Sequence, residues 1–318
     1  MQHLEVPTDM DGARLDRILA RAVPEWSRSR LQAVVRAGGV KIDGEVITKP
    51  GLPVAGGTQI EVELPETAPS VTPAGDAITE LDVIWEDEHF AAINKPPGLL
   101  SHPNTHSLRS SLVQLAEARY GTLPEADQPG RPGIVHRLDR LTSGVMMIAR
   151  TPEAMLAIKE QFMARTVAKT YIGVAHHVPE FETFWEDSPL EKDPARPERM
   201  RIAREGEGRE ASTLFETVER FRSYCILVAK PHTGRTHQIR VHAKHQGLPL
   251  VGDKHYPHPG ALSDPLPNAA PQLHRHALHA WKLEVDHPVS GERLEFVAPI
   301  PDDLQSLMDW LREHRPVK

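Results

Sequence analysis

The sequence predicts an α+β protein whose main domain is a mixed, mostly antiparallel sheet with helices packed around it. Short runs with the apolar or alternating pattern of strands recur between residues 81 and 297, and stretches with a helical apolar period lie between them. Residues 66–80 are rich in Pro, Thr and Ala without apolar periodicity, which is typical of a linker. We therefore expect a small α/β domain over residues 1–65, a linker over 66–80 and the main domain over 81–318.

The length and composition are those of a globular protein that can bury a core. The chain has 318 residues, which favours two domains, and it contains 39% hydrophobic and 25% charged residues. It has no run of 18 apolar residues and no signal-peptide pattern at its N-terminus, so we expect no membrane partner and a cytoplasmic location. Cys225 is the only cysteine, which excludes an intrachain disulfide and indicates a small buried side chain.

Basic residues are clustered although the net charge is −7. Between residues 14 and 41 there are seven Lys or Arg against two acids, and between residues 230 and 256 there are five against one acid. Binding to a phosphate backbone depends on local charge density rather than on net charge. The two clusters therefore favour a polyanionic partner over the alternative of solvated faces.

The sequence of the N-terminal domain predicts two helices, a hairpin and a final strand. Asp11 and Ser27 are candidate N-caps, and the glycines at 38–39 end the second helix. A hairpin follows over residues 40–47, with an Asp-Gly turn. Residues 59–64 alternate between polar and apolar side chains as a strand does.

Three arginines, Arg28, Arg30 and Arg36, lie on or beside the second predicted helix, where they are free to meet phosphates. This part of the chain resembles the alpha-L RNA-binding fold of some ribosomal proteins and tyrosyl-tRNA synthetases, over the stretch RLDRILARAVPEWSRSRLQAVVRAGGVKIDGEVI. The resemblance implies that the three arginines bind RNA. The alternative is a basic helical hairpin used for protein contacts.

The sequence of the main domain predicts eight strands and three helices. Strands are expected at residues 81–85, 90–93, 145–149, 169–175, 213–218, 224–229, 277–286 and 292–297. One helix is expected over 111–120, one after Thr151, which is a capping hydroxyl followed by Pro, and one after Pro301, where acids meet the positive helix end. Residues 180–210 are polar and rich in Pro, so no element is predicted there.

One short polar stretch, IVHRLDRLTSG at residues 134–144, has the composition of a functional loop. It places Asp139 between Arg137 and Arg140, directly before the apolar run at residues 145–149. Neighbouring guanidinium groups favour the ionised form of a carboxylic acid, and an ionised Asp held in place can act as nucleophile or base. The alternative is a solvated loop with local ion pairs.

A second polar stretch, TGRTHQIRVH at residues 233–242, carries Arg235 and Arg240. Its periodicity fits both an extended segment and a helix, so its conformation stays open. Arg keeps its charge and binds carboxylates in a two-pronged geometry, so one of these arginines is a candidate ion-pair partner for Asp139. The alternative is contact with phosphates or plain solvation.

Several other chemistries lack their sequence patterns. His237 and His242 are five residues apart rather than the four that align ligands on a helix, and the histidines around residue 276 lack an accompanying Cys or acid, so no metal site is expected. The sequence has no phosphate-binding or dinucleotide glycine pattern and no Gly-x-Ser-x-Gly elbow. A glycoside hydrolase would need a second acid in a setting like that of Asp139, and the polar motif stretches offer only Asp253.

Six motifs resemble those of one enzyme family. In order, the chain carries NKPPGLLSHP, HRLDRLTSG, KTYIGV, TGRTHQIRVH, GLPLVGDKHY and LHAWKLEVDHPVSGERLEFVAPIP. They are similar to the motifs of the RluA-type pseudouridine synthases, most closely to the D type, which acts on the large ribosomal subunit. The resemblance implies the fold of that family and the isomerisation of uridine in RNA to its carbon-linked form without a cofactor.

The same resemblance implies three catalytic residues. Asp139 is the catalytic carboxylate, which acts on the ribose or the base while the glycosidic bond breaks and the ring turns to present C5. Tyr171 stacks on the uracil and assists with the proton at C5, although aromatic residues also suit half-buried strands in general. Arg240 forms the ion pair that keeps Asp139 ionised and aimed.

Further RNA contacts are implied around these three residues. Arg137 enters the RNA and replaces the flipped nucleotide, since an enzyme must extrude a stacked base before it can react with it. Ile239 lines the base pocket. Lys95 and Arg235 contact phosphates.

The expected partner is therefore RNA, with large-subunit ribosomal RNA favoured, and the expected state is a monomer without metal or cofactor. Leu141 and the pair His176-His177 differ from the usual family pattern, which leaves the choice of uridine open. Three alternatives remain: the same chemistry on transfer RNA, a non-catalytic RNA-binding or ribosome assembly factor, and a hydrolase of nucleosides or glycosides that uses Asp139.

Overall fold

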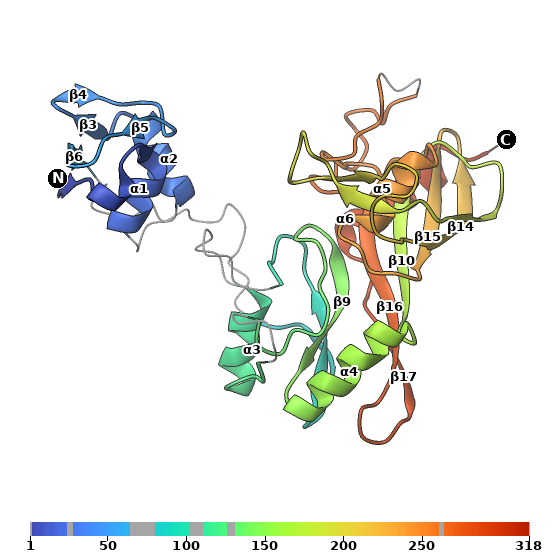
Figure 1. Cartoon of the computed structure of the whole chain (residues 1–318). Helices are drawn as coiled ribbons and strands as arrows, with labels where there is room; N and C mark the ends of the chain where they lie inside the picture. The colour runs from blue at the N-terminus through green and yellow to red at the C-terminus, as the bar shows by residue number, and fades with distance from the viewer. Residues whose placement is uncertain are drawn as a thin grey trace. The chain divides into compact units, whose positions relative to one another are not determined.

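The chain folds into two compact units (Figure 1). The computed structural model describes residues 2–23, 28–63, 80–101, 111–125, 131–260 and 264–317. One unit contains the described residues up to 63, and the other contains those from 80 onward. Within these described ranges, no helix is long and apolar enough to cross a membrane.

The N-terminal unit packs two helices against small antiparallel sheets. Its strands lie in the order β1 (Gln2–Glu5), β6 (Gln59–Val62), β3 (Val40–Ile42) and β4 (Glu45–Val46), and β2 (Ala13–Arg14) pairs with β5 (Pro53–Val54). The helical elements are η1 (Thr8–Met10), α1 (Leu15–Ala22) and α2 (Arg28–Arg36). Leu15, Leu19, Leu31, Val35 and Ile60 are buried together in its core.

The hairpin predicted over residues 40–47 is confirmed, because β3 pairs with β4 and both turn residues have a positive φ. The predicted cap at Asp11 is wrong. Arg14 occupies the N-cap of α1 without a side-chain hydrogen bond, and Asp11 accepts the backbone N–H of Gly56 instead. The predicted cap at Ser27 lies outside the described residues.

One large sheet organises the second unit. Its strands lie in the order β11 (Thr183–Glu186), β14 (Thr213–Phe221), β15 (Tyr224–Pro231), β10 (Ala168–His176), β16 (Leu278–Asp286), β9 (Ser143–Ala149), β8 (Phe90–Lys95) and β7 (Val83–Glu86), with β17 (Arg293–Val297) paired to β16. β9 and β16 run parallel, and the other described pairings in this sheet are antiparallel. The predicted mixed, mostly antiparallel sheet is therefore confirmed.

Two helices cover the part of the sheet formed by β8 and β9. α3 (Leu112–Tyr120) packs in a cluster with Ile93, whereas α4 (Pro152–Ala164) packs in a cluster with Ala92. Neighbouring residues of a strand point to opposite faces of the sheet. The two helices therefore lie on opposite faces, and Figure 1 shows them on either side of β9.

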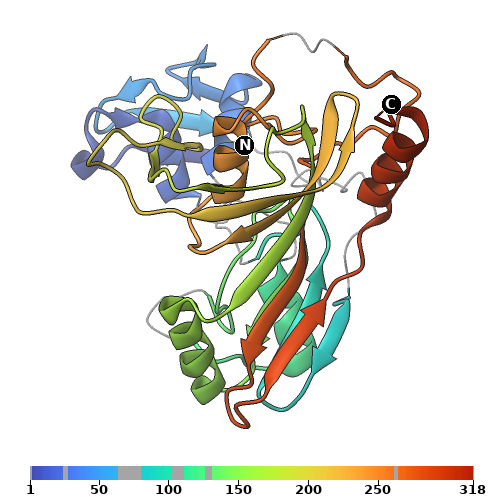
Figure 2. The same cartoon turned by 90° about the vertical axis from the view of Figure 1, so that its right-hand side faces the viewer.

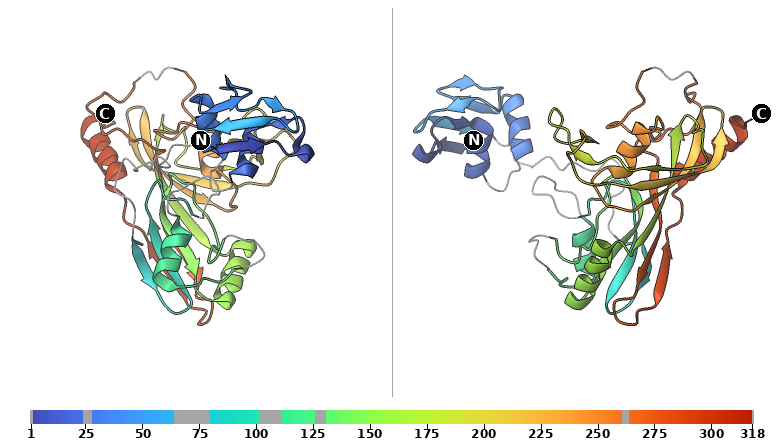
Figure 3. Two further views of the ribbon diagram at one scale, coloured as in Figure 1. Left: turned by 90° about the vertical axis from the view of Figure 1, so that its left-hand side faces the viewer. Right: turned by 45° about the vertical axis from the view of Figure 1, so that its right-hand side comes forward.

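Two further helices cover the part formed by β10 and β15. α5 (Gln238–His245) packs in a cluster with Leu227, whereas α6 (Asp302–His314) packs in a cluster with the neighbouring Ile226. By the same alternation they lie on opposite faces. Figures 2 and 3 show them apart, with α5 in orange and α6 in red.

The predicted starts of two helices are confirmed by their caps. Thr151 accepts the backbone N–H of Ala154 at the start of α4, with Pro152 at the first helical position. Ser111 and Gln114 form a reciprocal capping box at the start of α3. Because these hydrogen bonds join residues only three positions apart, the local sequence is sufficient to predict where both helices begin.

The segment at residues 180–210, where no element is predicted, contains short strands. It holds β11 and a two-stranded sheet of β12 (Leu190–Lys192) and β13 (Met200–Ile202). Strands of three or four residues carry too little alternation to be recognised in a sequence. Cys225, predicted to be a small buried side chain, is free and buried on β15.

Gly144 allows the close contact between β9 and β16. Its φ is +114°, and a Cβ at this position would lie 2.1 Å from the carbonyl oxygen of Ala280. Only glycine adopts that conformation readily and leaves that space. The parallel pairing of Gly144 with Ala280 therefore fixes where the polar loop before β9 enters the sheet.

Candidate active site

Asp139 lies on the loop that leads into β9, at a cleft in the second unit. The backbone N–H of Thr142 donates to the carbonyl oxygen of Asp139 at 3.0 Å and closes a turn in this loop. The cleft has a volume of about 720 Å³, and Tyr171, Ile239 and Arg240 line it together with Asp139. The loop before β9, strand β10 and helix α5 thus contribute side chains to one cleft.

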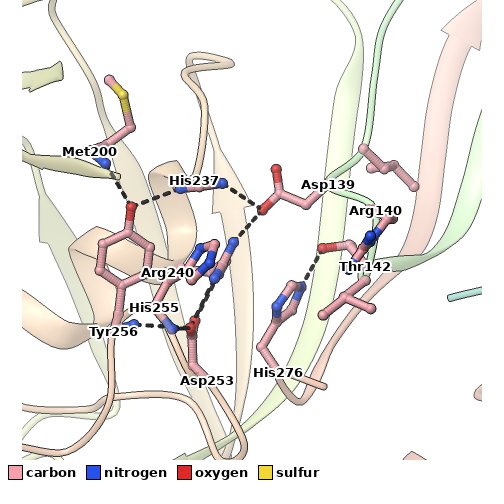
Figure 4. A network of polar contacts seen from close by, with 12 residues as sticks. Asp139, Arg140, Thr142, Met200, His237, Arg240, Asp253, His255, Tyr256 and His276 are labelled. Carbon is pink, nitrogen blue, oxygen red and sulfur yellow. Dashed lines mark hydrogen bonds and ion pairs between the residues drawn. The ribbon is translucent and has the colours of Figure 1, made fainter. Parts of the chain in front are cut away.

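Arg240 bridges two carboxylates (Figure 4). Its Nη1 donates to Oδ2 of Asp139 at 2.8 Å, and its Nε and Nη2 donate to Oδ2 and Oδ1 of Asp253 at 2.7 and 2.8 Å. Asp253 also accepts the backbone N–H groups of His255 and Tyr256. The two-pronged contact with Asp253 fixes the guanidinium plane, so that Nη1 is aimed at Asp139.

The neighbours of Asp139 keep it ionised. Burial raises the pKa of its carboxyl group, but its electrostatic interactions with His237 and Arg240 and the hydrogen bond from Arg240 lower it more, so the pKa lies below its usual value. Burial also raises the pKa of Asp253, and the hydrogen bonds and charge of Arg240 again outweigh it. Arg240 is therefore a permanent cation between two anions.

The contacts of Asp139 leave one of its oxygens available. Arg240 donates to Oδ2, and Nε2 of His237 lies 3.9 Å from the same oxygen. Among the described residues, Oδ1 has no hydrogen-bond partner, and the side chain of Asp139 is 20% exposed. Oδ1 is thus free to meet a ligand in the cleft.

Tyr171 presents an aromatic ring to the cleft beside Asp139. It stands on β10 directly after an irregularity between Thr170 and Tyr171, and such bulges re-aim side chains. Burial raises the pKa of its phenol, and the charge of Asp139 raises it further. The phenol therefore carries its proton at neutral pH.

Lys95 anchors the loop rather than facing the solvent. Its Nζ donates to the carbonyl oxygens of Pro96, Leu99 and Arg140, and the residue is fully buried. An ammonium group has three N–H bonds, and all three are used inside the protein. The phosphate contact predicted for Lys95 is therefore wrong, because its Nζ is buried and hydrogen-bonds within the protein, in part to Arg140 next to Asp139.

The other predicted RNA contacts have different surroundings. Arg137 is exposed and lines the cleft. Arg235 also lines the cleft, while its Nε donates to a backbone carbonyl. Arg36 is exposed on α2 in the N-terminal unit, whereas the side chains of Arg28 and Arg30 lie outside the described residues.

A second polar branch reaches Asp139 through His237. Nδ1 of His237 hydrogen-bonds with the hydroxyl of Tyr256 at 2.7 Å, and that hydroxyl accepts the backbone N–H of Met200 at 2.8 Å. The ring of Tyr256 also lies 5.0 Å from the guanidinium carbon of Arg240. Figure 4 shows both branches converging on Asp139.

Two buried histidines hydrogen-bond with the residues that join the Asp139 loop to β9. Nε2 of His276 hydrogen-bonds with Thr142 Oγ1 at 2.7 Å, and Nδ1 of His279 hydrogen-bonds with Ser143 Oγ at 2.9 Å. Burial lowers the pKa of His276 to about 3 and that of His279 to about 4, so both rings are neutral at physiological pH.

No site role is predicted from the sequence for Asp253, His237 or Tyr256, although all three lie in the motif stretches at residues 233–242 and 247–256. One local signal exists for Asp253. It accepts the N–H groups of the residues two and three positions later, which is the turn that Asp commonly forms with its own backbone. The partners of His237 come from other parts of the chain and leave no such local pattern.

Two family models match the chain. One, described as RNA pseudouridylate synthase, matches residues 89–245 and includes Asp139, Tyr171 and Arg240. The other, described as the S4 domain, matches residues 13–60. The two matches fall in the two compact units.

Named relatives and a solved structure agree with these models. The ribosomal large subunit pseudouridine synthase D of Xanthomonas campestris is 39% identical over 97% of this chain and 92% of that protein. The protein of the same name from Pseudomonas aeruginosa is 37% identical over 98% and 96% of the two chains. The structure of human RNA pseudouridylate synthase domain containing 4 matches with a TM-score of 0.57 and 25% identity over 72% of this chain and 92% of that one. By its motifs, its fold and these similarities, the chain belongs to the RluA-type RNA pseudouridine synthases, with an S4 domain.

Proposed function

We propose that this pseudouridine synthase acts on large-subunit ribosomal RNA and that Asp139 is its reactive carboxylate. The observation that carries the proposal is the shared arginine. Arg240 is fixed by Asp253, binds one oxygen of Asp139 and leaves the other oxygen of Asp139 free in the cleft. A charge fixed before the substrate arrives needs no reorganisation during the reaction.

The reaction that this site would serve is an isomerisation, so no atom is gained or lost. The bond between N1 and C1′ of uridine breaks, the uracil turns, a bond between C5 and C1′ forms, and a proton leaves C5 while N1 gains one. The ionised Asp139 acts on the ribose or the base while the glycosidic bond breaks. Tyr171 stacks on the uracil, and its protonated phenol places a polar group beside the ring.

The target uridine must leave its stack to reach Asp139. Extruding a base costs a few kcal/mol, which contacts with the protein have to offset. Arg137 is exposed at the cleft and is suited to occupy the gap left in the RNA. Ile239 forms an apolar wall of the base pocket, and Arg235 lies where it can meet a phosphate.

Two findings support large-subunit ribosomal RNA as the target. The relatives from Xanthomonas campestris and Pseudomonas aeruginosa carry that substrate in their names, and they align over nearly the whole chain. The S4-domain match contains the basic cluster with Arg28, Arg30 and Arg36.

We propose that residues 1–65 bind RNA and that residues 66–80 link them to the catalytic domain at residues 81–318. We also propose that the enzyme works as a cytoplasmic monomer without a membrane partner.

The role of Asp139 is tested with the Asp139→Asn variant, which keeps the shape of the side chain and removes its charge. We expect RNA binding within about twofold of the wild type and pseudouridine formation slowed by at least about 1000-fold, equal to about 4 kcal/mol of transition-state stabilisation. Asp309→Asn is the matched control, since Asp309 is an exposed acid on α6, and it should retain full activity. The measurement is the amount of pseudouridine formed in a large-subunit RNA fragment over time.

Three outcomes would contradict the proposal. Wild-type activity of Asp139→Asn would remove Asp139 from the chemistry. Release of free uracil from RNA would indicate a hydrolase. A strain that lacks the enzyme should lose a few pseudouridines from its large-subunit RNA, and losses confined to transfer RNA would overturn the target.

A further inference from the structure

His237 lies between the proposed catalytic carboxylate and a tyrosine, yet the proposed function gives it no part. We infer that His237 is a positioning residue, which is held by Tyr256 and presents its Nε2–H to Oδ2 of Asp139. This inference rests on the proposed role of Asp139. It places a second N–H group towards the same oxygen that Arg240 binds.

The hydrogen bonds of Tyr256 determine which nitrogen of His237 carries the proton. The Tyr256 hydroxyl accepts the backbone N–H of Met200 at 2.8 Å and lies 2.7 Å from Nδ1 of His237. Burial raises the pKa of Tyr256 to about 12, so the hydroxyl keeps its proton and can donate it to Nδ1. A neutral His237 then carries its own proton on Nε2, on the side of Asp139.

The backbone of His237 is held in an uncommon conformation that serves this geometry. The residue is the N-cap of α5 with φ 57° and ψ 15°, in the left-handed region, and its side chain makes no capping hydrogen bond. Such a conformation is unfavourable for a bulky side chain and persists where the surroundings enforce it. Here it turns the ring away from the helix end, so that one nitrogen meets Tyr256 and the other faces Asp139.

The distance to Asp139 defines what His237 can do in the free enzyme. Nε2 lies 3.9 Å from Oδ2, which is too long for a hydrogen bond but close enough for electrostatic stabilisation of the carboxylate. Arg240 already donates to that oxygen at 2.8 Å. With both donors on the side of Oδ2, rotation of the carboxylate is opposed and Oδ1 stays presented to the cleft.

The groups around His237 favour a neutral ring. Burial lowers the pKa of His237, Asp139 and Asp253 raise it, and Arg240 and His255 lower it, with a net lowering. The ring of His255 lies 5.7 Å from that of His237.

The test compares His237→Asn with His237→Gln in single-turnover pseudouridine formation between pH 3 and 8, a range that includes the acid limb expected from a carboxyl group whose pKa lies below its usual value. Asn tolerates the left-handed backbone and can still reach Tyr256, but its amide does not extend to Asp139. We expect His237→Asn to lose about tenfold in rate at pH 7.5, and its acid limb to move up by about 1 pH unit, because Asp139 loses a stabilising donor. His237→Gln, whose amide reaches the position of Nε2, should stay within about threefold of the wild type.

Controls separate this role from a general loss of structure. His177 also has a positive φ, 68°, and does not line the cleft, so His177→Asn should leave the rate and the pH profile unchanged. Tyr256→Phe keeps the ring beside Arg240 but removes the donor to Nδ1, and should shift the acid limb in the same direction as His237→Asn. RNA affinity should stay within about twofold in all variants.

An unshifted acid limb in both His237→Asn and Tyr256→Phe overturns the inference, even if the rates fall. Equal losses in the Asn and Gln variants also overturn it, because then the donor at the Nε2 position has no effect. Asp139→Asn separates the two levels. If it is active, the proposed function itself fails, whereas an inactive Asp139→Asn with a wild-type His237→Asn profile removes only the positioning role.

Discussion

Asp253 is the residue on which the aim of Arg240 depends. Its side chain is fully buried and accepts four hydrogen bonds, two from the guanidinium group and two from backbone N–H groups. A buried carboxylate with this many donors stays ionised. It holds the guanidinium from behind, while Asp139 meets it from the side of the cleft.

Asp253→Asn should therefore damage both stability and catalysis. An amide cannot accept from all four donors, and Arg240 loses half of its charge compensation. Removing one partner of a buried ion pair costs about 3–5 kcal/mol, so we expect a loss of about that size in the free energy of unfolding, measured with urea. The rate of pseudouridine formation should fall by about 10- to 100-fold, because Nη1 is no longer aimed at Asp139.

Glu219→Gln is the control for this substitution. Glu219 pairs with Arg312 at the surface, where their side chains are 34% and 44% exposed. Exposed pairs contribute about 0–1 kcal/mol, so this variant should be close to the wild type in both measurements. Similar losses in the two variants would show that Asp253 has no special part.

The sequence predicts the acid and its cation but not the residues that support them. The chemistry of the polar stretches leaves Arg235 and Arg240 open as the partner of Asp139, the family resemblance singles out Arg240, and the structure contains that ion pair. The contacts of His237 with Tyr256 depend on three-dimensional packing, so no local pattern predicts them. The phosphate contact predicted for Lys95 is wrong for the same reason, since a sequence does not show that an ammonium group is buried among carbonyls.

Elements differ in how clearly their boundaries can be read. The start of α4 is marked by Thr151 and Pro152, which form their contacts within a few residues. The start of α5 at His237 has a left-handed backbone without a side-chain cap, so the sequence leaves helix and strand equally open there. Tertiary contacts with Tyr256 and Asp139 decide this boundary instead of local preference.

The junction of β9 with β16 rests on a buried pair, Ser143 and His279. Nε2 of His279 faces the carbonyl oxygen of Ala298 at 3.3 Å, so it carries the proton, and Nδ1 accepts the hydroxyl of Ser143 at 2.9 Å. The neutral ring satisfies both neighbours. Protonation would require Ser143 to reverse its hydrogen bond in a site that is closed to water.

We expect the buried His279 to make the folded protein less stable as the pH falls. Burial lowers the pKa of His279 to about 4 from its ordinary 6.5, so between these values the unfolded chain binds a proton that the folded chain does not. Stability therefore rises with pH across this window and falls as pH drops below 6.5. At pH 5 the loss from this residue is about 2 kcal/mol, because pH 5 lies about 1.5 pH units below the ordinary pKa of 6.5 and still above the pKa in the folded protein.

His279→Gln should reduce the slope of unfolding free energy against pH between 6.5 and 4.5 by the contribution of about one proton, measured by urea unfolding at several pH values, while the buried His276 keeps its own contribution. His314→Gln, at an exposed position on α6, should keep the acid slope of the wild type. An unchanged slope in His279→Gln would show that acid sensitivity arises elsewhere.

The whole molecule combines a net charge of −7 with basic residues gathered at one end of the chain and at the cleft. A uniform acidic surface would repel RNA, whereas local clusters release counterions when they meet phosphates. The N-terminal unit carries Arg36 exposed on α2, in the region matched by the S4 domain. The affinity for RNA should therefore depend on position of charge more than on its total.

Arg36→Gln tests this distribution. Loss of one phosphate contact should weaken RNA binding a few-fold at about 0.1 M salt and reduce the slope of log K against log salt by about 1. Arg312→Gln changes the net charge equally but removes an arginine that pairs with Glu219 and Asp309 on α6. Binding should be nearly unaffected in that control, and equal effects of both substitutions would show that only total charge matters.

The hydrogen bond between Arg240 and Asp139 joins positions 101 residues apart. A nascent chain that has been synthesised only through β9 already holds the acid, yet it has neither the cation that orients it nor the carboxylate that holds this cation. The complete set of ion pairs can therefore form only after the chain has been synthesised as far as Asp253. Since we propose Asp139 as the reactive group, we expect chains that end before Arg240 to be inert towards the RNA that surrounds them.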